Sequence, residues 1–131
     1  MSSAVSRVPA AQSERALRHF SAQLEFETDC WDVHHALTNQ RQDFILVDVR
    51  GNELFAQGHI AGAVNIPHSR LNEKALVDYP LDCLFVVYCA GPHCNGTEKA
   101  AIRLAKLGRP VKKMIGGVTG WLDEGFDLIG S

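Results

Sequence analysis

The chain has 131 residues, of which 46% are hydrophobic and 21% are charged, so wholesale disorder is excluded and a single domain with its own core is expected. The formal net charge is −2, which gives no basic field to attract nucleic acid or an anionic membrane. The longest apolar run, residues 84–90, falls short of the roughly 18 residues that span a membrane. We therefore expect no nucleic-acid partner and no membrane partner.

Two segments precede the main domain. Residues 1–12 are small and polar, and we expect a flexible N-terminus. Residues 13–25 predict an N-terminal helix, because apolar side chains recur there at helical spacing. Those side chains are Ala16, Leu17, Phe20 and Leu24. The domain itself is predicted over residues 26–131.

Strands and helices alternate along the predicted domain. Strands are predicted at residues 26–28, 44–49, 63–66, 84–88 and 111–115. Helices are predicted after a cap at Asp29, at residues 52–57, 71–77 and 97–107, and as a final turn from Gly117. The β-branched apolar run at residues 44–49 is typical of a strand buried on both faces. Such alternation predicts an α/β domain with a mainly parallel sheet, in which ligands bind at the carboxyl ends of the strands.

Cys89 lies at the carboxyl end of the strand predicted at residues 84–88. Backbone N–H groups of a glycine-rich loop, together with the N-terminus of the following helix, are suited to surround an anion. A thiol with a pKa of about 8.5 is about 3% ionised at pH 7, whereas one with a pKa of about 6.5 is roughly 75% ionised. We predict that Cys89 is a nucleophile, and the alternative is a small buried residue that ends a strand. The predicted binding loop comprises Ala90, Gly91, Pro92, His93, Cys94, Asn95, Gly96 and Thr97, with Thr97 as the helix cap.

The other three cysteines have different predicted roles. Cys30 and Cys83 are expected to be structural. Cys94 shares the loop with Cys89, where it could resolve a sulfenate or a persulfide as a disulfide. The chain is not rich in cysteine and its first residues lack the apolar stretch of a secretory signal, so we expect free thiols and a cytoplasmic protein.

The sequence offers candidate metal ligands but not the spacing of a metal site. Cys89, His93 and Cys94 are close in sequence, and His59 and His68 are candidates to approach them. No paired Cys-x-x-Cys or His-x-x-x-His spacing is present, although structural zinc usually takes four ligands. We expect neither a metal nor a cofactor.

Three segments resemble the rhodanese superfamily. Residues 48–67 are similar to its N-terminal signature, which reads Asp-x-Arg, then an acidic residue, then Gly-His-Ile-x-Gly-Ala-x-Asn-Ile-Pro. Residues 87–89, with the glycine-bearing loop and the Ala-rich helix after them, resemble its catalytic segment. Gly-Gly followed by Trp at residues 116–121 resembles its C-terminal signature. Order and spacing agree over roughly residues 26–126.

This resemblance implies a fold and a reaction. The fold is an α/β rhodanese-like domain with a five-stranded, mainly parallel sheet flanked by helices on both faces. Cys89 is implied to accept sulfane sulfur from thiosulfate or a persulfide donor and to pass it, as a covalent persulfide, to a thiol or cyanide. Backbone amides of residues 90–96 would hold the sulfur and the leaving group.

The resemblance also implies a supporting role for part of the N-terminal signature. The residues implied to fix the sheet and its neighbouring loops are Asp48, Arg50, Glu53 and His59. Arg50 and Glu53 are interpreted either as an ion pair or as two solvated side chains.

The loop departs from the pattern of the superfamily. Many members have a shorter loop that often carries Arg or Lys, whereas His93 is the only candidate cation among residues 89–96. We therefore expect His93 to favour anionic donors. Dual-specificity phosphatases of the superfamily need an Arg where this chain has Asn95, so phosphatase activity is disfavoured. The missing Arg also favours a protein persulfide or a low-molecular-weight persulfide over thiosulfate as the donor.

The favoured function is sulfur transfer through Cys89. Two alternatives stay open: a non-catalytic binding or regulatory module that uses the loop face, and a thiol redox protein that uses Cys89 and Cys94. The expected partners are a small-molecule or protein sulfur donor and a thiol acceptor. The chain is expected to be a monomer or a weak homodimer.

Overall fold

A five-stranded sheet with strand order β1-β5-β4-β2-β3 lies at the centre of the fold. Its strands are β1 (Glu27–Thr28), β2 (Phe44–Asp48), β3 (Val64–Asn65), β4 (Leu84–Tyr88) and β5 (Val111–Met114). Every pairing between these strands is parallel, which confirms the predicted parallel sheet. The structure, a computed structural model, describes residues 1–130. The strand order places β4 in the middle of the sheet.

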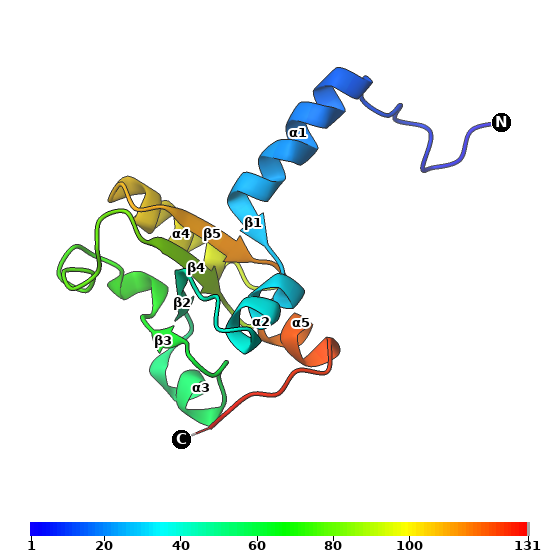
Figure 1. Ribbon diagram of the computed structural model, residues 1–131. Helices are drawn as coiled ribbons and strands as arrows, with labels where there is room; N and C mark the ends of the chain where they lie inside the picture. The colour runs from blue at the N-terminus through cyan, green and yellow to red at the C-terminus, as the bar shows by residue number, and fades with distance from the viewer. Residues whose placement is uncertain (131) are drawn as a thin grey trace.

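Helices cover both faces of the sheet (Figure 1). They are α1 (Ser13–Phe26), α2 (Cys30–Thr38), α3 (Asn52–Gln57), the 3-10 helix η1 (His68–Arg70), α4 (Gly96–Lys106) and α5 (Gly117–Asp123). One face of the sheet packs against α4, whereas α2 and α5 pack together on the other. No helix within residues 1–130 combines the length and the apolar character that crossing a membrane requires.

The side chains of β4 divide between two core layers. Phe85 and Val87 pack with Leu104 of α4, whereas Val86 packs with Trp121 of α5. Successive side chains of a strand point to opposite faces, so one continuous apolar run fills both layers. The strand that leads to Cys89 is therefore anchored from both sides.

The helix predicted at residues 71–77 is wrong, because this segment forms a run of turns. A continuing helix would need the N–H of residue 80 to donate to the Leu76 carbonyl, and Pro80 has no N–H. That carbonyl instead accepts from the Tyr79 N–H at 3.0 Å and from Arg109 Nη2 at 3.1 Å. Arg109 Nη1 donates to the Pro80 carbonyl at 2.7 Å. A side chain that is distant in sequence therefore holds these turns.

α1 forms where the apolar periodicity predicts a helix, but it buries none of its residues. Leu17, Phe20 and Leu24 are 69%, 62% and 72% exposed. Figure 1 shows α1 projecting away from the sheet beyond β1. Its C-terminal end is attached, because Lys112 of β5 donates from Nζ to the Leu24 carbonyl at 2.9 Å. The periodicity thus predicts the helix but not its place outside the core.

Candidate functional site

Cys89 directly follows β4 and is 5% exposed. Its sulfur lies against the first turn of α4, since a Cβ added to Gly96 would stand 2.8 Å from Cys89 Sγ. Glycine at position 96 therefore makes this close approach possible. The first N–H groups of an α-helix have no intrahelical acceptor, and the helix dipole is positive there. The start of a helix is a position that generally lowers the pKa of a free cysteine thiol.

The cap predicted at Thr97 is wrong. α4 begins at Gly96, with Asn95 in the cap position and without a hydrogen bond from its side chain. The Asn95 carbonyl accepts from the Lys99 N–H at 3.1 Å, so helical bonding begins before Thr97. The Thr97 hydroxyl donates instead to Glu98 Oε1 at 2.5 Å. Because the Asn95 side chain does not cap the helix, the start of α4 stays open toward Cys89.

Cys94 is joined to Cys89 by a disulfide, with 6.5 Å between the two Cα atoms. The Cys94 N–H donates to the Gly91 carbonyl at 3.0 Å, which turns the loop back toward the end of β4. Cys94 is half-buried, whereas Cys89 is buried. The expectation of free thiols is therefore wrong for this pair, because the loop brings the two sulfur atoms within bonding distance, whereas Cys30 and Cys83 are free.

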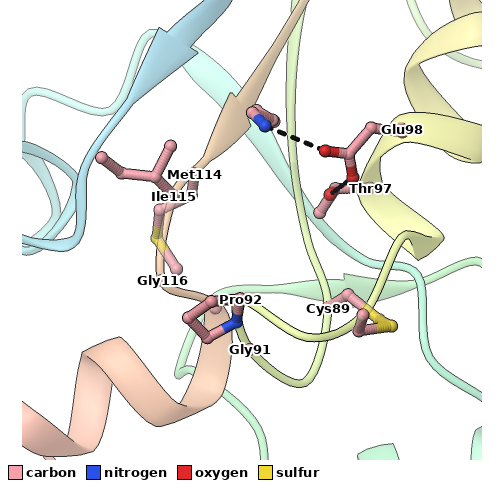
Figure 2. Close-up of a pocket in the computed structure, with 11 residues that line it drawn as sticks. Cys89, Gly91, Pro92, Thr97, Glu98, Met114, Ile115 and Gly116 are labelled. Carbon is pink, nitrogen blue, oxygen red and sulfur yellow. Dashed lines mark hydrogen bonds and ion pairs between the residues drawn. A yellow bond between two sulfur atoms is a disulfide. The ribbon is translucent and has the colours of Figure 1, made fainter. Parts of the chain in front are cut away.

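A pocket of about 240 Å³ opens beside this disulfide (Figure 2). Three segments line it: the loop after β4, the first turn of α4, and the end of β5 with the turn that follows. The lining residues are Cys89, Gly91, Pro92, Cys94, Thr97, Glu98, Lys113, Met114, Ile115, Gly116 and Gly117. Both cysteines of the disulfide therefore belong to the wall of one pocket.

Lys113 supplies a cation to this pocket, and sequence reasoning missed it. It lies in β5, which is paired with β4, and its Nζ is 2.9 Å from Glu98 Oε2 and 3.9 Å from Glu27 Oε1. Hydrogen bonds from Thr97 and then Lys113 hold the pKa of Glu98 below its ordinary value. The local sequence carries no signal for Lys113, because its place depends on the strand order, in which β5 adjoins β4.

His93, predicted to supply the cation of the loop, does not line the pocket. It is exposed, and its Cε1 would be 3.2 Å from a Cβ added to Gly91. Asn95 is exposed as well and lies outside the lining. The cation of the pocket lining is therefore Lys113 rather than His93, and the N-terminal end of the α4 dipole adds positive potential beside the sulfur.

Asp48, the last residue of β2, forms a buried ion pair with Arg50. Asp48 is 0% exposed, and its Oδ2 accepts from Arg50 Nη2 at 2.7 Å. Its Oδ1 accepts from the Arg50 backbone N–H at 3.0 Å. The same Nη2 donates to the Gly58 carbonyl at 2.6 Å, which fixes the chain after α3. The interpretation of Arg50 and Glu53 as an ion pair is wrong, since Arg50 is committed to Asp48 and Glu53 is exposed in α3.

His59 lies in the same region as this ion pair. Its Nδ1 is 2.7 Å from the Phe55 carbonyl, and its ring stacks on the Phe55 ring with the centroids 3.7 Å apart. Its backbone N–H donates to the Ile129 carbonyl at 2.8 Å, which ties the C-terminal segment to the domain. Asp48, Arg50, Glu53 and His59 all lie outside the lining of the pocket at Cys89. Over residues 1–130, no three His, Cys, Asp or Glu side chains are grouped to hold a metal ion.

Gly117 positions the backbone of Cys89 from the side of α5. Its φ is +59°, in the left-handed region that favours glycine. A Cβ at this position would collide with the Cys89 carbonyl and stand 2.9 Å from the Gly91 nitrogen. The neighbouring Val118 N–H donates to the Cys89 carbonyl at 3.0 Å. The start of α5 therefore holds the start of the loop.

We expect Gly117→Ala to lower the free energy of unfolding by about 1–3 kcal/mol more than Gly108→Ala does. Both variants place alanine at a positive φ, 59° and 74°, so both incur the free-energy cost of a left-handed backbone at a residue with a Cβ. Only Gly117 has crowded backbone around it, because nothing lies within 4 Å of a Cβ at Gly108. Urea unfolding of the two variants measures the difference. Equal losses of unfolding free energy in the two variants would show that a Cβ at position 117 is accommodated beside the Cys89 carbonyl without cost.

Cys30 is a buried thiol outside the pocket. Burial raises its pKa from 9.0 to about 11, and the charges of Asp29 and Glu124 add to this effect. The neutral thiol therefore stabilises the fold fully below pH 9.0, and this contribution is lost as the pH rises toward 11. We expect Cys30 to escape alkylation by iodoacetamide at pH 8 in the folded, reduced protein and to react in urea. Peptide mass spectrometry checks this expectation, and equal labelling in the two states would contradict it.

Comparison with protein families and with curated proteins found one matching family and several similar proteins. The family model for the rhodanese-like domain matches residues 32–124. The chain is 39% identical over 84 residues to the HTH-type transcriptional regulator Rv0324 of Mycobacterium tuberculosis. It is 34% identical over 87 residues to the adenylyltransferase and sulfurtransferase UBA4 of Yarrowia lipolytica. These matches cover 63% and 64% of this chain, but only 36% and 22% of the two longer proteins.

Solved structures confirm the predicted fold class. The BH2092 protein from Bacillus halodurans is 35% identical, with a TM-score of 0.87 over 91% of this chain and 87% of that chain. The rhodanese-like domain of the Alr3790 protein from Anabaena is 26% identical, with a TM-score of 0.71 over 80% of this chain and 79% of that chain. A thiosulfate sulfurtransferase from Pseudomonas aeruginosa, at 19% identity, shares the fold with a TM-score of 0.68 over 84% of this chain and 21% of its own.

Proposed function

We propose that this chain, which belongs to the rhodanese-like domain family, is a sulfurtransferase in which Cys89 carries a sulfane sulfur as a persulfide. The observation that supports this most directly is the place of the Cys89 sulfur, against the open start of α4 and in the wall of a pocket. A relative from Yarrowia lipolytica that carries sulfurtransferase in its name is in line with the proposal.

Sulfur transfer proceeds in two displacements. The Cys89 thiolate attacks the outer sulfur of the donor, the S–S or S–C bond of that sulfur breaks, and the remainder leaves with the bonding electrons, as sulfite in the case of thiosulfate. An acceptor thiolate then attacks the terminal sulfur of the persulfide, takes it, and releases the Cys89 thiolate. The start of α4 and Lys113 stabilise the negative charge in both steps. The disulfide to Cys94 must be reduced before the first displacement.

The charges around the pocket bear on the donor. Lys113 is neutralised in part by Glu98 and Glu27, so a doubly charged donor such as thiosulfate gains less attraction than an unpaired lysine would give. We therefore infer that a protein persulfide or a low-molecular-weight persulfide is the better donor.

The test uses the Cys94→Ser variant, in which no disulfide can consume Cys89. Reduced variant is incubated with thiosulfate or with glutathione persulfide, and the intact mass is measured. We expect a gain of one sulfur atom that peptide mapping assigns to Cys89. The double variant Cys89→Ser/Cys94→Ser is the control and should gain nothing. Absence of the adduct with both donors, in protein whose Cys89 is readily alkylated, would falsify the proposal.

A thiol redox protein is a second candidate, and the Cys89–Cys94 disulfide is the observation that favours it. Under this function, mild peroxide oxidises reduced protein to the same disulfide, and a dithiol restores both thiols. Mass spectrometry of the peptide that contains Cys89 and Cys94 shows whether oxidation links the two sulfur atoms or modifies each one separately. A linkage that forms and reverses supports this candidate, whereas separate oxidation of the two sulfur atoms counts against it.

A further inference from the structure

The second cysteine of the loop is within bonding reach of the first. The Cα atoms of Cys89 and Cys94 are 6.5 Å apart, inside the range that disulfides span. The hydrogen bond from the Cys94 N–H to the Gly91 carbonyl belongs to the fold of the loop itself. The two sulfur atoms therefore meet within the loop, and no helix or strand must move to join them.

We propose that Cys94 is a resolving thiol, which reduces the persulfide of Cys89 and makes this protein a sulfide-releasing persulfide reductase. This inference rests on the proposed function, because it needs the persulfide to form. The disulfide observed between Cys89 and Cys94 is then the product of one turnover.

The reaction balances without an external oxidant. The Cys94 thiolate attacks Cys89 Sγ, which is the inner sulfur of the persulfide. The bond between Cys89 Sγ and the terminal sulfur breaks, and the terminal sulfur leaves with the electron pair as hydrosulfide. The Cys94 sulfur is oxidised from thiolate to disulfide level, the terminal sulfur is reduced to sulfide, and Cys89 Sγ exchanges one S–S bond for another. A low-molecular-weight thiol or a dithiol protein then reduces the disulfide by exchange and restores both thiolates.

The disulfide is the product of attack on the inner sulfur of the persulfide and not of attack on the terminal sulfur. Attack on the inner sulfur gives the Cys89–Cys94 bond that the structure contains. Attack on the terminal sulfur would instead move the sulfur to Cys94 and leave Cys89 free. Both cysteines line the pocket, which is therefore the route proposed for hydrosulfide to leave and for the reducing thiol to enter.

The other two cysteines are poorly placed for this role. Cys30 is buried under α5, where its Sγ lies 3.5 Å from the Ile115 carbonyl, and it does not line the pocket. Cys83 precedes β4, at the opposite end of that strand from Cys89. Cys83 therefore offers a matched control, because its removal deletes a thiol and leaves the loop unchanged.

The test is a single turnover in the absence of added thiol. Wild-type, Cys94→Ser and Cys83→Ser proteins are reduced, desalted and mixed with one equivalent of glutathione persulfide, and released sulfide and intact mass are followed. We expect wild type and Cys83→Ser to release about one equivalent of sulfide and to end as the Cys89–Cys94 disulfide. We expect Cys94→Ser to keep one extra sulfur atom on Cys89 and to release sulfide at least about tenfold more slowly.

Each of the other possible results of this experiment contradicts one specific part of the proposal. Wild-type protein that keeps its persulfide and releases no sulfide overturns the resolving role but leaves the sulfurtransferase intact. Extra sulfur found on Cys94 overturns attack on the inner sulfur. A Cys94→Ser protein that takes up no sulfur overturns the proposed function itself. Cys94→Ala replaces Cys94→Ser if the serine variant does not fold.

Discussion

Cys89→Ser is expected to slow sulfur transfer from a persulfide donor to a thiol acceptor at least about a thousandfold. A serine hydroxyl at the same position stays protonated near neutral pH and cannot take a sulfane sulfur as a persulfide does. The rate of acceptor persulfide formation, measured with donor and acceptor both in excess, reports the loss. The change is small in volume, so the thermal unfolding midpoint serves as the check that the fold is kept.

Cys83→Ser is the control for this rate measurement. Cys83 is also a thiol, partly buried at the start of β4, and lies away from the pocket. We expect its removal to leave the rate within about twofold of wild type. A Cys89→Ser protein that keeps a substantial part of the wild-type rate would show that another group carries the sulfur.

Asp48→Ala is expected to lower the free energy of unfolding by about 3–5 kcal/mol. The substitution leaves the Arg50 guanidinium without its carboxylate in a site where the two side chains are 8% and 0% exposed. It also removes the acceptors of the Arg50 backbone N–H and of Arg50 Nε. An unpaired buried charge costs more than the pair itself contributes, so the loss is large. Urea unfolding, analysed as a two-state transition, measures it.

Two further variants control this stability measurement. Glu53→Ala removes an exposed carboxylate of the same signature and should change the free energy of unfolding by less than about 0.5 kcal/mol. Asp48→Ala/Arg50→Met removes both charges, and we expect it to be more stable than Asp48→Ala alone. If Asp48→Ala costs no more than Glu53→Ala, the buried pair does not stabilise the domain.

Much of the fold follows from local pattern, and the exceptions have physical reasons. The continuous apolar runs of β2 and β4 predict buried parallel strands because few other structures accommodate them. The turns at residues 71–77 escaped prediction because Arg109, from beyond α4, binds the carbonyls of Leu76 and Pro80, a contact that the local pattern does not show. A helical period reports only that one face is apolar, which is why α1 was predicted but its exposure was not.

The candidate site likewise combines residues that the local sequence predicts with residues whose place depends on the tertiary structure. Cys89 could be found because its strand and its glycine-rich loop are adjacent in sequence. Lys113 could not, because its place depends on β5 lying next to β4. The contact of Cys94 with Cys89 stayed open for a different reason: the path of a loop depends on which backbone groups bond within it, such as the Cys94 N–H with Gly91.

The exposed helix α1 has a consequence for hydrogen exchange. None of its 14 residues is buried, and isolated helices shorter than about 12–15 residues are marginal in water. Opening of α1 therefore does not require opening of the sheet, and its amide hydrogens are expected to exchange with deuterium through local fluctuations. The amides of β4, paired on both sides by β2 and β5, exchange only when the domain unfolds. We therefore expect two regions in one chain whose exchange rates differ by orders of magnitude and respond separately to denaturant.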